Sequence, residues 1–111
     1  MEREEFEKVV EHALATLPDF IRSKLQNIDI VIEEQPIVHK SLLGLYQGVP
    51  LKKRGVWYGN VMPDKITLFK KNIERISSNE EELKHWIHRV IIHEIGHYFG
   101  FDEEGLRRSG Y

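Results

Sequence analysis

The chain has 111 residues, with 16 basic and 18 acidic side chains and a formal net charge of −2, so we expect one domain spanning residues 1–111. A net charge near zero argues against nucleic acid or an anionic membrane as the main partner. The lack of cysteine excludes disulfides, cysteine-ligated metal sites and a thiol nucleophile. No apolar run approaches the roughly 20 residues that span a bilayer, and the acidic segment 2–5 is unlike a secretory signal, so we expect a cytoplasmic protein.

The N-terminal segment has the pattern of an amphipathic helix. From Phe6 to Leu17, apolar residues recur three and four positions apart, which predicts one helical face packed on the core. Pro18 is expected to end this helix or to open a short second helix over residues 20–25.

Two predicted strands flank an irregular segment. Residues 28–34 are rich in β-branched side chains and predict a strand that closes at Pro36. Residues 36–64 contain glycines and aromatic residues without a clear period, and they predict either hairpin turns whose aromatic side chains cap the core or a loop that contacts a substrate. Residues 65–70 partly alternate and predict a second strand, followed by a short helix through residues 73–76.

The pattern near the C-terminus predicts one long helix over about residues 79–99. Ser78, with Glu81 three positions later, matches a capping box, and apolar residues then recur at helical spacing as far as Tyr98. Gly100 stands where a helix commonly ends in a left-handed conformation.

An H-E-x-x-H motif lies on this predicted helix, in the sequence His93-Glu94-Ile95-Gly96-His97. Residues four apart share a helical face, so both imidazoles can reach one tetrahedral zinc ion at about 2.0–2.1 Å. Glu94 points about 100° around the helix, away from a ligand position but within reach of a water at the metal. That is the position of a general base in metal-assisted hydrolysis.

A catalytic zinc ion needs a third protein ligand. Gly100 allows a sharp turn after the helix, and Glu103, three residues beyond it, is the ligand we expect. Asp102 is the next candidate, and His39 or Asp64 would serve if these carboxylates are only solvated. Two histidines and a carboxylate leave a fourth position for a water whose pKa falls to about 7. The same set suits Fe(II), but the adjacent glutamate favours hydrolysis over oxygen chemistry.

Other polar residues are candidates for supporting roles or for none. Three tyrosines are candidate oxyanion donors: Tyr46, Tyr58 and Tyr98. We expect His85 and His88 to be ordinary histidines, because neither lies four positions from the first histidine of the motif. The basic clusters at residues 52–54 and 70–71 are expected to be solvated or to help bind an acidic peptide.

The chain resembles the small bacterial zincin-like metallopeptidases. Three stretches carry the resemblance, at residues 42–50, 63–69 and 93–101. The resemblance implies a compact α+β domain, with a small mixed sheet packed against a long active-site helix and an N-terminal helix. It also implies zinc ligands at the two motif histidines, a catalytic base at the motif glutamate and an acidic residue at the position of Glu103. Both methionines lie upstream of the motif, which argues against the metzincins.

The sequence therefore predicts a zinc-dependent metallopeptidase that uses a glutamate base to activate water against peptide bonds. The expected partner is a peptide or protein substrate, which could lie extended along a sheet edge near residues 56–69. The alternative is a non-catalytic zincin-like binding module, in which the helix binds metal for stability or binds none.

Overall fold

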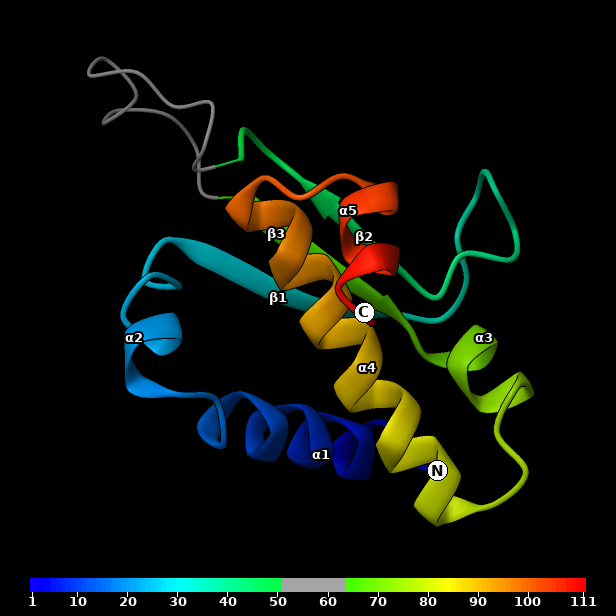
Figure 1. Cartoon of the computed structure of the whole chain (residues 1–111). Helices are drawn as coiled ribbons and strands as arrows, with labels where there is room; N and C mark the ends of the chain where they lie inside the picture. Colours follow the sequence, from blue (N-terminus) through cyan, green and yellow to red (C-terminus); the bar gives the residue numbers. More distant parts are fainter. Residues whose placement is uncertain (51–63) are drawn as a thin grey trace.

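The computed structural model describes residues 1–50 and 64–111 (Figure 1). Its elements in chain order are α1 (Arg3–Ala15), α2 (Asp19–Arg22), β1 (Ile28–Glu33), β2 (Gly44–Gln47), β3 (Asp64–Phe69), α3 (Lys70–Arg75), α4 (Glu80–Phe99) and α5 (Glu103–Arg108). Helix α4 crosses in front of the sheet formed by the described strands, and α1 packs against α4. This arrangement confirms the predicted α+β fold, with a small mixed sheet against a long helix and an N-terminal helix.

Helix α1 is the amphipathic helix predicted for the N-terminal segment. Its apolar face buries Phe6, Val10 and Ala13. The helix ends at Ala15, and α2 begins directly after Pro18, so the proline separates the two helices as predicted. Helix α2 is shorter than predicted and buries none of its residues.

The strands have the order β1-β3-β2. Strand β1 runs parallel to β3, with Ile30 opposite Ile66, and β2 runs antiparallel to β3, with Tyr46 opposite Ile66. The bounds of β1 and β3 lie within one residue of the predicted strands at residues 28–34 and 65–70. The parallel pair needs a long connection, and the residues between β1 and β3 supply it.

Strand β2 lies inside residues 36–64, where the sequence predicts irregular structure. It has only four residues and begins with a glycine, which ordinarily weakens a strand. Here the glycine permits close packing, because a Cβ atom at Gly44 would lie 2.7 Å from Val90 Cγ1 on α4. The antiparallel pairing with β3 favours the hairpin interpretation of this segment, while Trp57 and Tyr58 lie outside the described residues.

The position of β3 corrects the predicted substrate path. Residues 64–69 pair with a strand on each side, so this segment is the centre of the sheet and not an edge. Residues 56–63 lie outside the described part of the chain. Among the described strands, the open edges belong to β1 and β2.

Helix α4 confirms the long helix predicted over about residues 79–99. Its N-cap is Asn79 and not Ser78, because the Asn79 Oδ1 atom accepts a hydrogen bond of 2.8 Å from the main-chain N–H of Glu82. Serine and asparagine are both good N-caps, and each has a glutamate three positions later, so the pattern could not separate them. Gly100 ends the helix with φ of 108°, as predicted. Among the described residues, none of the helices combines the length and the apolar character of a membrane-spanning segment.

The core lies between the sheet, α1 and α4. Its buried apolar residues are Phe6, Val10, Ala13, Ile32, Ile66, Leu68, Ile73, Leu83, Ile87, Val90, Ile91 and Ile95. The core residues on α4 extend from Leu83 near its start to Ile95 inside the H-E-x-x-H motif. The helix that carries the motif is therefore fixed by the core along most of its length.

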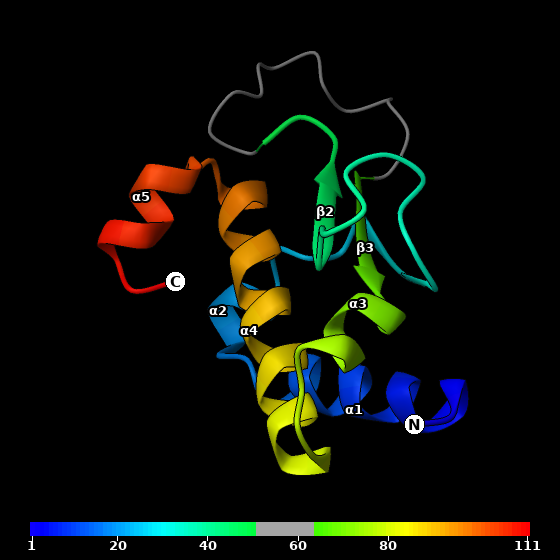
Figure 2. The same ribbon diagram turned by 90° about the vertical axis from the view of Figure 1, so that its right-hand side faces the viewer.

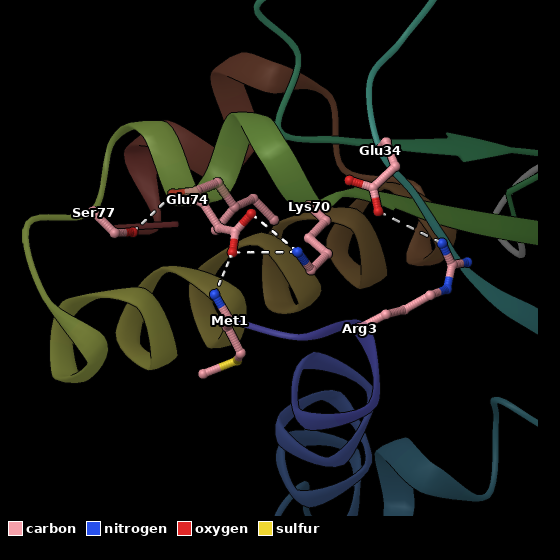
Figure 3. A network of polar contacts seen from close by, with 7 residues as sticks. Met1, Arg3, Glu34, Lys70, Glu74 and Ser77 are labelled. Atoms are coloured by element: carbon pink, nitrogen blue, oxygen red, sulfur yellow. Dashed lines mark hydrogen bonds and ion pairs between the residues drawn. The ribbon is translucent and has the colours of Figure 1, made fainter.

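A polar network joins the start of α1 to α3 (Figure 3). The Glu74 carboxylate accepts hydrogen bonds from the Met1 amino group at 2.9 Å and from Lys70 Nζ at 3.2 and 3.3 Å. Lys70 is buried and Lys71 is exposed, so the solvated cluster predicted at residues 70–71 is wrong for Lys70 and right for Lys71. Burial favours a higher pKa for Glu74, but the hydrogen bonds and charges of the two ammonium groups outweigh it and lower the pKa.

Candidate metal centre

The two histidines of the motif lie side by side near the end of α4. The ring centroids of His93 and His97 are 4.9 Å apart. Both rings direct Nε2 at one oxygen of Glu103, whose Oε1 atom is 3.1 Å from His93 Nε2 and 2.6 Å from His97 Nε2. The three potential ligand atoms all lie within 4.8 Å of one another. The structure thus brings together the three residues predicted as metal ligands.

A tight turn carries Glu103 back to the histidines. Gly100 has φ of 108°, a conformation that glycine adopts without strain. Helix α5 then begins at Glu103, after its N-cap Asp102. The Asp102 Oδ1 atom accepts a hydrogen bond of 2.7 Å from the main-chain N–H of Gly105. The two candidate carboxylates therefore differ in use, since Asp102 starts the helix and Glu103 faces the imidazoles.

Helix α5 packs directly on the motif. A Cβ atom at Gly96 would lie 2.3 Å from Leu106 Cδ2, and Leu106 is buried. The glycine inside the motif therefore makes room for the one buried side chain of α5. The sequence contains no signal for α5, because six residues with four charges show no apolar period.

Main-chain oxygens hold the outer side of each imidazole. His93 Nδ1 is 2.9 Å from the oxygen of Tyr111, and His97 Nδ1 is 2.8 Å from the oxygen of Phe101. Because both oxygens are acceptors, a neutral imidazole carries its proton on Nδ1 and leaves Nε2 free to bind a cation. Sequence reasoning missed these partners, since no side-chain pattern identifies a main-chain oxygen.

The ionisable groups of the cluster stabilise one another's charged forms. Burial alone lowers the pKa of His93, but hydrogen bonds to Tyr111 and Glu103 and the charges of Glu103 and Glu94 outweigh it and raise the pKa. Burial alone raises the pKa of Glu103, but hydrogen bonds and charge interactions with His93 and His97 outweigh it and lower the pKa. Glu103 is therefore anionic near neutral pH, as a cation ligand must be.

Glu94 stands apart from the cluster of three, as its position in the motif predicts. Its side chain is buried, and burial is the largest influence on its pKa, which is raised above the ordinary value. His97, His93 and a backbone hydrogen bond from Tyr46 act in the opposite direction, while the charge of Glu103 adds to the rise. A carboxylate with a raised pKa accepts a proton from water more readily than one with the ordinary pKa.

The upstream candidates for a third ligand lie elsewhere. The Asp64 side chain is buried, and its Oδ2 atom accepts a hydrogen bond of 2.6 Å from the Tyr46 hydroxyl. His39 is exposed on the segment before β2 and has a φ of 53°. Neither residue belongs to the cluster around His93.

The candidate oxyanion donors are only partly brought to the site. The Tyr98 hydroxyl donates a hydrogen bond of 2.7 Å to the carbonyl oxygen of Lys24. The Tyr46 hydroxyl donates to the buried carboxylate of Asp64, although Tyr46 itself lines the cleft beside the cluster. Tyr58 and the basic cluster at residues 52–54 lie outside the described residues.

A cleft of about 720 Å³ opens at the cluster. Residues from the segment 41–50, which includes β2, line one side, and the end of α4 with the following turn lines the other. Figure 2 shows β2 and α5 on opposite sides of the C-terminal half of α4. A cleft of this size accommodates a small ligand or several residues of a peptide.

The donor set fits a zinc ion. Two imidazole nitrogens and one carboxylate oxygen are the protein ligands of many catalytic zinc sites, which keep a fourth position open. Tetrahedral bonds of about 2.0–2.1 Å place ligand atoms about 3.3 Å apart. The separation of 3.1 Å is close to that value and the separation of 2.6 Å is shorter, but the exposed side chain of Glu103 has room to adjust.

The helix with its H-E-x-x-H motif, the glycine turn and the acidic residue beyond it together define a zincin-like centre. Residues 25–111 match the family model of the zincin-like metallopeptidases, a segment that runs from before β1 through α5. The chain belongs to this family, and the resemblance predicted from the sequence is confirmed. A search of curated proteins finds no match.

Proposed function

We propose that the protein is a zinc-dependent peptidase. In this proposal His93, His97 and Glu103 hold the metal, and Glu94 is the general base. The observation that carries the proposal is the convergence of the three potential ligand atoms within 4.8 Å, on the wall of an open cleft. Membership of the zincin-like metallopeptidases supports both the metal and the peptide substrate.

The ligand residues are oriented before a metal binds. The oxygens of Tyr111 and Phe101 hold the Nδ1 atoms of the two imidazoles, and the Glu103 carboxylate already lies 3.1 and 2.6 Å from their Nε2 atoms. A zinc ion bound there supplies a Lewis acid for the scissile carbonyl and lowers the pKa of a water to about 7. Because the ligand side chains are already oriented, they reorganise less when the metal binds.

Glu94 moves the proton. Its carboxylate accepts a proton from the attacking water as the water oxygen bonds to the carbonyl carbon. When the carbon–nitrogen bond breaks, Glu94 returns that proton to the nitrogen of the leaving amine. Burial raises the pKa of Glu94, and a raised pKa favours the protonated form that exists between these two steps. The backbone hydrogen bond from Tyr46 holds the carboxylate in place.

Among the described strands β2 lies at an edge of the sheet, and this edge offers a binding surface for an extended peptide. Phe69 N–H donates to the Leu43 oxygen at 2.9 Å, so in this antiparallel ladder the main-chain groups of Gly44 and Tyr46 face away from β3. Both residues line the cleft. Because the Tyr46 N–H already donates to Glu94, a substrate added at this edge would gain its main-chain hydrogen bonds beside the metal ligands from Gly44.

The experiment compares the parent with Glu94→Gln on a mixture of peptides from an unrelated digested protein. Mass spectrometry should detect new cleavage products with the zinc-loaded parent, and kcat/KM of the variant should fall by about 10²–10⁴. Elemental analysis should still find zinc in the variant. Glu81→Gln, an exposed change in the first turn of α4, is the matched control and should keep full activity.

Three results would contradict the proposal. Equal activity of the parent and Glu94→Gln would refute the assigned base. Stoichiometric zinc without cleavage of any peptide would favour the non-catalytic binding module, and iron in place of zinc would favour an oxygenase.

A further inference from the structure

We propose that Arg89 selects substrates with a carboxylate within about two residues of the scissile bond. The inference rests on the proposed peptidase function and adds a substrate class to it. The carboxylate can belong to an acidic side chain or to the C-terminus of a short peptide. Three observations carry the inference: the position of Arg89 on α4, its contact with Trp86 and the distribution of charge in the cleft.

Arg89 lies on the same helical face as the first metal-ligand candidate. It precedes His93 by four residues, a spacing that puts Cβ atoms about 5–6 Å apart on one face. Its side chain is exposed and lines the same cleft as His93. An extended peptide advances about 3.3 Å per residue, so a substrate group that meets Arg89 stands one or two residues from the metal site.

The Arg89 guanidinium lies over the ring of Trp86. Arg89 Cζ lies 5.8 Å from the centroid of the Trp86 ring, and Trp86 also lines the cleft. Contact with an aromatic face restricts the plane of the guanidinium and leaves its N–H edge open. That edge matches a carboxylate through two parallel hydrogen bonds.

No described carboxylate neutralises this cation. Within residues 1–50 and 64–111, the acidic side chains that line the cleft are Glu94, Asp102 and Glu103, and none of them forms an ion pair with Arg89. Asp102 caps α5, Glu103 contacts the imidazoles, and Glu94 is buried. Arg89 is the one arginine or lysine among the described lining residues, and its exposed guanidinium is available to an anionic group of the ligand.

The test measures peptide binding without turnover. Zinc-loaded Glu94→Gln protein is titrated with fluorescent octapeptides that carry Glu or Gln at each position in turn, each with a free or an amidated C-terminus. The same titrations are repeated with two double variants, in which the Glu94→Gln protein also carries Arg89→Gln or Arg89→Glu. The control is Arg75→Gln, which removes the same charge from an exposed residue outside the cleft. Circular dichroism verifies that each variant is folded.

Glu-containing or free-ended peptides should bind about fivefold tighter than their neutral partners at low salt. Arg89→Gln should remove this preference, Arg89→Glu should reverse it, and Arg75→Gln should preserve it. A preference that persists in amidated peptides identifies a side-chain carboxylate, whereas one confined to free ends identifies the C-terminus. Equal binding of all peptides, no binding, or a preference that survives Arg89→Gln overturns the inference.

The two proposals fail in different ways. A parent protein that cleaves peptides with no preference dependent on Arg89 retains its peptidase function and loses only this inference. A parent that cleaves nothing, while Glu94→Gln keeps the preference dependent on Arg89, loses the peptidase function and retains a carboxylate-binding cleft.

Discussion

Glu103 and Asp102 are adjacent carboxylates with different structural tasks. The Asp102 carboxylate accepts a hydrogen bond from the main-chain N–H of Gly105 in the first turn of α5, and this bond fixes where the helix begins. Glu103, the first residue of that helix, is then directed at the two imidazoles. The sequence favours Glu103 by its distance from Gly100, but the cap is what separates the two residues physically.

Replacing each carboxylate should therefore have a different effect. Glu103→Ala should weaken zinc binding by more than the roughly 10–100-fold that the loss of an outer partner costs. Asp102→Ala should cost about 1 kcal/mol of folding stability through the lost cap, with a smaller effect on zinc. Competition with a chelating dye measures zinc affinity, and urea unfolding measures stability. A larger loss of zinc affinity in Asp102→Ala would instead identify Asp102 as the ligand.

Two glycines set the distances around the motif. A Cβ atom at Gly44 would approach Val90 to 2.7 Å and Glu94 Cγ to 3.2 Å, and one at Gly96 would approach Leu106 to 2.3 Å. The absence of both side chains lets β2 and α5 contact opposite sides of α4. The cleft walls are therefore built from positions where any larger residue would displace a neighbour.

The length of each element decides how far the sequence predicts it. The twenty residues of α4 show many apolar repeats, a cap region and a terminal glycine, which are local signals that agree. Strand β2 has four residues and α5 has six, too few for a period to emerge. Both form through tertiary contacts, β2 by pairing with β3 and α5 by packing Leu106 on Gly96.

The same distinction applies to the candidate site. The spacing of His93, Glu94 and His97 within one helix is a local property, and the sequence predicts it fully. The oxygens of Phe101 and Tyr111 are held against the imidazoles by the path of the chain after α4. Their side chains carry no information about this role, so only the fold reveals it.

The contact between α1 and α4 should make stability depend on pH. The rings of His12 on α1 and His88 on α4 have centroids 6.4 Å apart. Burial lowers the pKa of His88, and the positive charges of His12 and His85 lower it further. Packing of the uncharged His88 ring between the two helices therefore stabilises the fold. This contribution to the free energy of unfolding is fully present above the ordinary pKa near 6.5, and it is lost as the pH falls through the lowered pKa of the folded state.

His88→Gln should accordingly show a smaller loss of unfolding free energy than the parent between pH 7.5 and pH 5.5. Urea denaturation at each pH gives this free energy, and zinc is kept at one concentration throughout. His39→Gln changes an exposed histidine outside both helices and should follow the parent curve. Parallel curves for His88→Gln and the parent would refute the assignment.

On the scale of the whole molecule, the core and the metal centre share one helix but little else. The buried apolar cluster joins α1, the sheet and α4, and it includes none of the proposed ligands. Two ligands stand on α4, which the core fixes, and the third stands on α5, which the Gly100 turn connects. A bound metal should therefore link α5 to a fold that is already complete.

Removal of zinc should lower the melting temperature without unfolding the chain. Zinc at 100 times its Kd adds about 2.7 kcal/mol, which corresponds to about 10 °C for a domain of this size. Chelation should leave the far-ultraviolet circular dichroism largely unchanged, while amide hydrogen exchange should quicken in α5 and stay slow in β3. Glu103→Ala should show almost no zinc-dependent shift, because the ion no longer connects α5 to α4. Global unfolding on chelation would mean that the fold itself requires the metal, as in structural zinc modules.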